Sequence, residues 1–167
     1  GGLWAAIKKG KLRAVRNLYS IGASTDPEIE RLPSSTIMFA VGEASADTFA
    51  VICECEGKDR VLAERYNAIT DESGEFVFKV SLASWLAATG EVDKLRVLID
   101  LFGKAVLRAE GKNDPVYMAV SERKVDVLRL LYTVRQRPLK VAEGGYTALT
   151  LVLGRPPEWE KLEAFIR

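Results

Sequence analysis

Residues 3–23 read LWAAIKKGKLRAVRNLYSIGA, and the pattern of apolar residues in this segment indicates the type of fold. Its apolar residues recur at the i, i+3, i+4 and i+7 spacing on each side of Gly10, which is typical of helices with one buried face. The first stripe is Leu3, Ala6 and Ile7, and the second is Leu12, Val15, Leu18 and Tyr19. Gly22 is placed to end the second helix as a C-terminal cap. The stretch therefore predicts a helical hairpin.

The hairpin pattern recurs along the chain. A shift of 34 residues aligns it with residues 37–53, and a shift of 113 aligns it with residues 116–132, in both cases without a gap. Further copies contain Leu86–Ile99 and Leu149–Ile166. The predicted repeats span about residues 1–33, 34–57, 81–112, 113–143 and 144–167. This period of about 33 residues predicts an all-α solenoid of four to five helical hairpins that form one domain, residues 1–167.

The repeat resembles the ankyrin repeat, whose consensus begins T-P-L-H-x-A-A. Residues 114–120, DPVYMAV, resemble that opening; residues 90–93, GEVD, resemble the turn between the helices; and residues 144–149, GGYTAL, resemble the finger between repeats. Because no copy keeps the full tetrapeptide, we expect the hydrogen bonds of its Thr and His to be absent and the array to be less regular. The nearest alternative is another α-solenoid, such as HEAT or TPR repeats.

The repeat register predicts which residues are buried. These are Ala6, Leu18, Ile52, Leu98, Ala119, Leu128, Leu131 and Leu149.

An insertion of about residues 58–80 interrupts the period. It contains a charged segment with helical character, Lys58–Tyr66, a polar turn at Thr70–Glu75, and the strand-like Phe76–Val80. We expect the strand to pair within the insertion or to offer its edge to a partner. Insertions in repeat proteins lie on one face, often the binding face. The alternative is an ornamental loop whose phenylalanines pack back on the helices.

Composition excludes several classes of function. Of the 167 residues 48% are hydrophobic, which argues against disorder. The chain carries 24 Lys and Arg against 23 Asp and Glu, so its net charge creates no electrostatic field that would attract nucleic acid or an anionic membrane. No apolar run approaches the length of about 18 residues that a membrane span requires. The chain has no histidine, the commonest general base and zinc ligand. It also has no glycine-rich phosphate loop, so we expect no cofactor, no metal and no enzymatic activity.

The cysteines and the chain ends suggest a cellular context. Cys53 and Cys55 are expected to be small residues on a packed helix, which suits a reducing, intracellular and cytoplasmic environment. The chain begins with Gly1 and stops at Arg167 within its last expected helix. We therefore expect a domain excised from a longer protein, or an array capped by its own divergent ends, that is monomeric or part of a larger chain.

The resemblance implies recognition of another protein through a concave face made by finger tips and first helices. In ankyrin-like repeats the finger tip and the turn after the first helix face the ligand, which gives nine candidate residues. They are Lys8, Lys9, Lys11, Lys112, Asn113, Glu122, Arg123, Tyr146 and Trp159. The two aromatic residues are the expected anchors. The alternatives are an enzyme or effector fragment with a carboxylate site at Asp71, Glu72 and Glu75 in the insertion, or a structural spacer of a larger protein.

Overall fold

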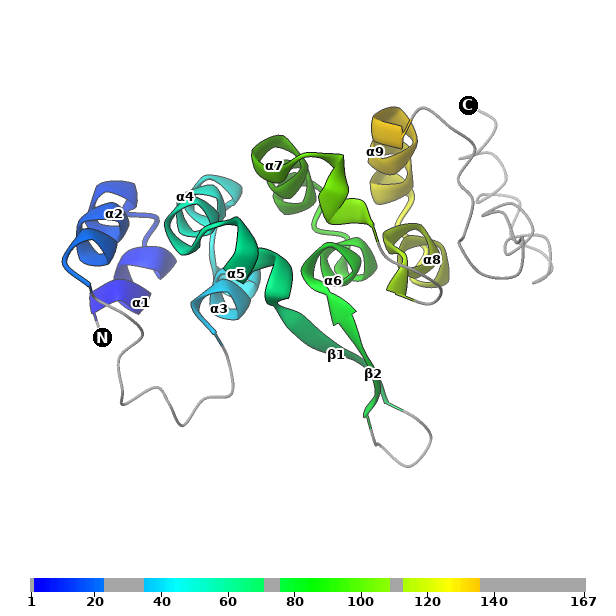
Figure 1. Cartoon of the computed structure of the whole chain (residues 1–167), viewed down its shortest axis with the longest axis horizontal. Coiled ribbons are helices and arrows are strands. Elements are labelled where there is room, and N and C mark those ends of the chain that lie inside the picture. The colour runs from blue at the N-terminus through cyan, green and yellow to red at the C-terminus, as the bar shows by residue number, and fades with distance from the viewer. Residues whose placement is uncertain (1, 23–34, 71–75, 109–112, 136–167) are drawn as a thin grey trace. The chain divides into compact units, whose positions relative to one another are not determined.

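The computed structural model describes residues 2–22, 35–70, 76–108 and 113–135 (Figure 1). This part of the chain is mostly helical and contains one two-stranded sheet. The chain divides into two compact units, Gly1–Glu64 and Arg65–Arg167, and each is described by itself. The predicted fifth repeat, residues 144–167, lies outside the described residues.

The first unit contains two helical hairpins and one short helix. In the first hairpin α1 (Gly2–Lys8) packs on α2 (Leu12–Ser20), and in the second α3 (Thr36–Glu43) packs on α4 (Ala46–Glu56). The hairpins stack in parallel, since α1 contacts α3 and α2 contacts α4. Helix α5 (Lys58–Ala63) follows α4 directly after Gly57. The core between these helices contains Ile7, Val15, Ile37, Phe49 and Ile52, all fully buried.

The second unit repeats this arrangement. Helix α6 (Leu82–Thr89) packs on α7 (Val92–Phe102), and α8 (Pro115–Ser121) packs on α9 (Val125–Arg135). Again the first helices contact each other, α6 on α8, and the second helices do the same, α7 on α9. A short 3-10 helix, η2 (Lys104–Leu107), packs against α7. The buried core includes Leu86, Leu95, Leu98, Val116 and Leu131.

The same turn joins the two helices in three of the described hairpins. Gly10, Gly90 and Arg123 all adopt a positive φ, of 62°, 84° and 58°. In each turn the amide of the next residue donates to the carbonyl five residues before it, with N···O distances of 2.9, 2.9 and 2.8 Å. This hydrogen bond is that of a Schellman helix end, which favours glycine at the left-handed position. The glycine of two turns was readable from the sequence, and the third turn carries arginine instead.

Short polar residues cap three of the first helices, α3, α6 and α8. Ser35 and Ser81 accept hydrogen bonds from backbone amides three residues later at 3.1 and 3.2 Å, and Asp114 accepts one from the amide of Val116 at 2.7 Å. Pro115 follows at the first helical position, where no amide is required. Ser and Asp side chains thus serve as the hydrogen-bond acceptors at the starts of these helices.

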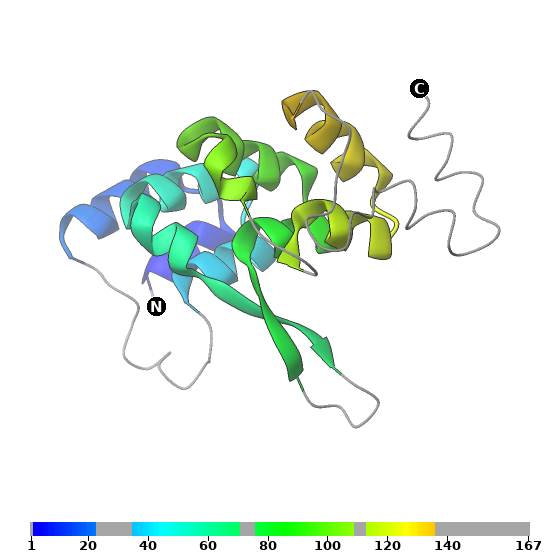
Figure 2. The ribbon, with the colours of Figure 1, turned by 45° about the vertical axis from the view of Figure 1, so that its right-hand side comes forward.

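The insertion folds as α5 and a β-hairpin. Strand β1 (Arg65–Thr70) pairs antiparallel with β2 (Phe76–Ser81), which confirms the strand predicted at Phe76–Val80 (Figure 2). The helical segment predicted for Lys58–Tyr66 is too long, since α5 ends at Ala63. Tyr66 instead pairs with Val80 in the sheet and is 2% exposed. Burial of this large side chain on a strand explains the shorter helix.

The predicted core residues are largely buried. The six that are buried as predicted are Ala6, Ile52, Leu98, Ala119, Leu128 and Leu131. Leu18 is only partly buried, and Val15 is the fully buried residue of α2. The prediction for Leu18 is therefore wrong, since α2 turns Val15 rather than Leu18 fully into the core. Leu149 lies outside the described residues.

Candidate functional site

Three of the predicted contact residues gather at the turn between α1 and α2. Lys8 ends α1, Lys9 follows it, and Lys11 is the residue that precedes the first turn of α2. All three are exposed. The ammonium of Lys8 lies 3.4 Å from a carboxylate oxygen of Glu43 in the next hairpin.

Asn113 has a structural role. Its side-chain oxygen accepts a hydrogen bond from the backbone amide of Ser81 at 2.9 Å, and its carbonyl accepts one from the hydroxyl of Ser84. These bonds join Asn113, two residues before α8, to the start of α6. The side chain of this predicted contact residue thus helps to hold two hairpins together.

Glu122 and Arg123 lie at the other end of α8. Glu122 caps its C-terminus and Arg123 forms the following turn, whereas Asn113 precedes its N-terminus. A helix of seven residues is about 10 Å long. Asn113 therefore lies at one end of α8, and Glu122 and Arg123 lie at the other end. Lys112, Tyr146 and Trp159, like Asp71, Glu72 and Glu75, lie outside the described residues.

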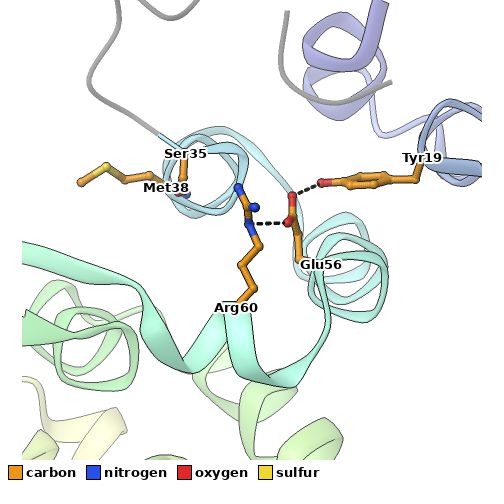
Figure 3. Close-up of polar contacts among 5 residues, drawn as sticks. All are labelled: Tyr19, Ser35, Met38, Glu56 and Arg60. Atoms are coloured by element: carbon orange, nitrogen blue, oxygen red, sulfur yellow. Dashed lines mark hydrogen bonds and ion pairs between the residues drawn. The ribbon is translucent and has the colours of Figure 1, made fainter. Parts of the chain in front are cut away.

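A cluster of Tyr19, Glu56 and Arg60 was not predicted from the sequence (Figure 3). The hydroxyl of Tyr19 on α2 donates to one carboxylate oxygen of Glu56 at 2.7 Å, and Nε of Arg60 lies 2.7 Å from the other. Burial, together with the bonded carboxylate, raises the pKa of Tyr19 far above its ordinary value, so its hydroxyl remains a donor. The cluster ties α2 to α4 and α5. The Glu56–Arg60 spacing of four residues was a readable signal, but no pattern pointed to a contact with Tyr19, 37 residues earlier.

Charge is segregated between the two hairpins of the first unit. Residues 2–22 contain five cations and no anion, and residues 35–57 contain four anions and no cation. The cations are Lys8, Lys9, Lys11, Arg13 and Arg16, and the anions are Glu43, Asp47, Glu54 and Glu56. Ion pairs join the hairpins from Lys8 to Glu43 and from Arg16 to Glu54, the latter at 2.7 Å. Lys9, Lys11 and Arg13 form no ion pair within the described part of the chain.

The two cysteines lie on α4, as predicted. Burial, with smaller contributions from Glu56 and Glu54, raises the pKa of the Cys53 thiol to about 12. Burial also raises the pKa of the half-buried Cys55. Both thiols are therefore protonated near neutral pH, and protonated thiols are poor nucleophiles.

The β-hairpin is anchored at its base. The rings of Tyr66 on β1 and Trp85 on α6 stack with centroids 5.4 Å apart and planes inclined by 14°. Val80, the residue paired with Tyr66, is fully buried, and its neighbour Lys79 is exposed. This contact positions the strands relative to α6.

Within the described residues, no group of His, Cys, Asp and Glu side chains could hold a metal ion. None of the described helices combines the length and the apolar character that crossing a bilayer would demand. No protein family, no curated protein and no solved structure matches this chain.

Proposed function

We propose that this protein is an ankyrin-like solenoid that recognises another protein and catalyses no reaction. The observation that carries the proposal is the stacking of successive hairpins in each unit, with first helix on first helix and second helix on second helix. Stacked units of this kind leave rows of loops and helix ends that can follow the surface of a partner.

The spacing of equivalent residues supports the repeat. The capping residue Asp114 follows Ser81 by 33 residues, and the turn residue Arg123 follows Gly90 by the same number. Gly57 and Gly103 also occupy equivalent positions, since each ends an eleven-residue second helix and begins a shorter one. The period of an ankyrin repeat is 33 residues.

The chemistry of the described polar groups favours recognition over catalysis. Both carboxylate oxygens of Glu56 are occupied by Tyr19 and Arg60, and burial keeps Cys53 protonated. A general base requires a free acceptor, and a nucleophilic cysteine requires an accessible thiolate.

Affinity capture tests the proposal. The tagged full chain is incubated with extract of its source cells, and each captured protein is purified and titrated against the chain by calorimetry. We expect one saturable partner whose affinity falls in the double variant Arg123→Ala with Tyr146→Ala. The matched control, Arg108→Ala with Tyr132→Ala, removes the same residue types from two exposed positions elsewhere in the chain.

The alternatives make different predictions. If the chain is a structural spacer, no captured protein should bind it saturably once the chain and that protein have both been purified. An enzyme with a carboxylate site would turn over a substrate and lose that activity on Glu72→Gln with Glu75→Gln. Either result would overturn the proposal.

A further inference from the structure

The cations of the first hairpin fall into two groups. Lys8 and Arg16 pair with carboxylates of the second hairpin and so help to hold α1 and α2 in place. Lys9, Lys11 and Arg13 are exposed and form no ion pair with any residue that the structure describes. We call these three residues the basic edge.

Two residues of the basic edge, Lys11 and Arg13, lie where a cation is unfavourable for the helix. Lys11 precedes α2 without a side-chain hydrogen bond to it, and Arg13 lies in its first turn, which contains no acidic residue. The N-terminus of a helix carries a partial positive charge, so cations there are unfavourable. Lys11 and Arg13 lie at the positive end of the α2 dipole and pair with no carboxylate that the structure describes, which leaves a local positive potential for an external anion to neutralise.

We propose that the basic edge binds an acidic segment of the partner protein, an inference that rests on the proposed function. Leu12 lies between Lys11 and Arg13 and is 37% exposed. The edge thus offers an apolar contact flanked by cations, which complements a segment in which carboxylates flank an apolar residue. Charge complementarity of this kind speeds association and selects the partner more than it adds affinity.

A nucleic acid fits the edge less well than an acidic segment. The whole chain has a net charge of only +1, and neutralising a phosphate backbone requires a longer basic stripe.

The test is a fluorescence-anisotropy titration of the full chain at low ionic strength. The probe is a labelled peptide in which Glu and Asp flank single leucines, and its counterpart carries Gln and Asn in place of the acids. The variant replaces Lys9, Lys11 and Arg13 with Gln. The matched control replaces Lys58, Lys104 and Arg108 with Gln, which removes the same number of Lys and Arg from other exposed positions. Since Lys11 and Arg13 oppose the dipole of α2 whereas Lys9 follows the C-terminus of α1, removal of all three should leave the melting temperature nearly unchanged.

We expect the unchanged chain to bind the acidic peptide and to bind its neutral counterpart at least about tenfold more weakly. The basic-edge variant should lose about tenfold in affinity for the acidic peptide, whereas the affinity of the control variant should stay within about twofold. Equal loss in both variants, or equal binding of both peptides, would overturn the inference. So would tighter binding of a DNA duplex or of phosphatidylserine vesicles through the same three cations.

The inference and the proposed function fail separately. If a captured partner binds the basic-edge variant at full affinity, the basic edge is the wrong surface but recognition of a protein stands. If the unchanged chain has no saturable partner, the proposed function fails, whatever the peptide shows.

Discussion

At the scale of single residues, the pKa of Cys53 makes stability depend on alkaline pH. The folded chain holds the thiol proton up to a pKa of about 12, whereas the unfolded chain releases it near the ordinary value of 9.0. Between these values the folded state binds more protons, so the free energy of unfolding falls as pH rises above 9. Tyr19, whose pKa is also raised, acts in the same direction above its ordinary value of 10.0.

We therefore expect Cys53→Ala to flatten the loss of stability above pH 9. Urea unfolding at several pH values from 7 to 11 measures this, and the difference between the variant and the unchanged chain should be constant below pH 9 and shrink above it. Alanine creates a small cavity, so the comparison uses the slopes rather than the absolute stabilities. Parallel curves over the whole range would show that Cys53 does not titrate as described.

Arg123 tests the turn geometry, because it is the one described non-glycine residue with a positive φ. At φ 58° a Cβ is disfavoured, so we expect Arg123→Gly to be more stable than Arg123→Ala by about 1 kcal/mol. Both variants lose the arginine side chain, and their difference reports the backbone alone. The same pair at Arg129, an exposed position inside α9, should show the opposite order, with Gly about 1 kcal/mol less stable than Ala.

At the scale of elements, Asn113 joins two hairpins of the second unit. Asn113→Ala removes the acceptor for the amide of Ser81, and we expect a loss of about 1–2 kcal/mol in the free energy of unfolding. Glu122→Ala at the exposed end of α8 is the control and should stay within about 0.5 kcal/mol. If Asn113→Ala weakens partner binding without lowering the free energy of unfolding, Asn113 contacts the partner and does not hold the hairpins together.

The packing of α8 on α9 depends on Leu131, which is fully buried. Leu131→Ala should cost about 2–5 kcal/mol, because the cavity cannot collapse fully between packed helices. The next residue, Tyr132, is 60% exposed and provides the control. Equal urea midpoints for Leu131→Ala and Tyr132→Ala would show that the helix register is wrong.

At the scale of the whole molecule, the β-hairpin is the feature that a plain hairpin array lacks. A short Gly-Ser linker in place of Glu72–Lys79 removes most of β2. We expect the helices to stay folded, because they contain most of the buried core and the new connection alters the cost of loop closure by only about 1 kcal/mol. The buried base of the hairpin, Tyr66 and Val80, remains in this variant. Helical circular dichroism and the melting temperature report the fold, and calorimetry with the partner reports binding, which should weaken.

The outcomes of this replacement are distinct. If the variant loses helical structure but its remaining folded molecules still bind the partner, the strands are part of the core. Intact folding with intact binding would make the hairpin ornamental. The control Lys79→Gln removes the exposed charge of β2 and keeps both strands.

The local elements of this protein can be predicted from its amino-acid sequence alone. The helical periodicity predicts the helix pairs from α1 to α9, and the alternating residues at Phe76–Val80 predict β2. These signals are readable because they lie within a few turns of one chain segment, where the spacing of apolar residues reports directly which face is buried. The ends of the elements are harder to predict: α5 ends at Ala63, three residues before the end that the sequence predicts.

Only the tertiary structure decided the contacts between elements. The hydrogen bond from Tyr19 to Glu56, the stacking of Tyr66 on Trp85, and the bond from Ser81 to Asn113 join residues that are 37, 19 and 32 positions apart. No local pattern encodes such pairs, because they depend on how the hairpins stack and on which polar groups the stacking leaves to be satisfied. The same holds for the basic edge, since five cations look alike in the sequence until two of them find carboxylates on the neighbouring hairpin.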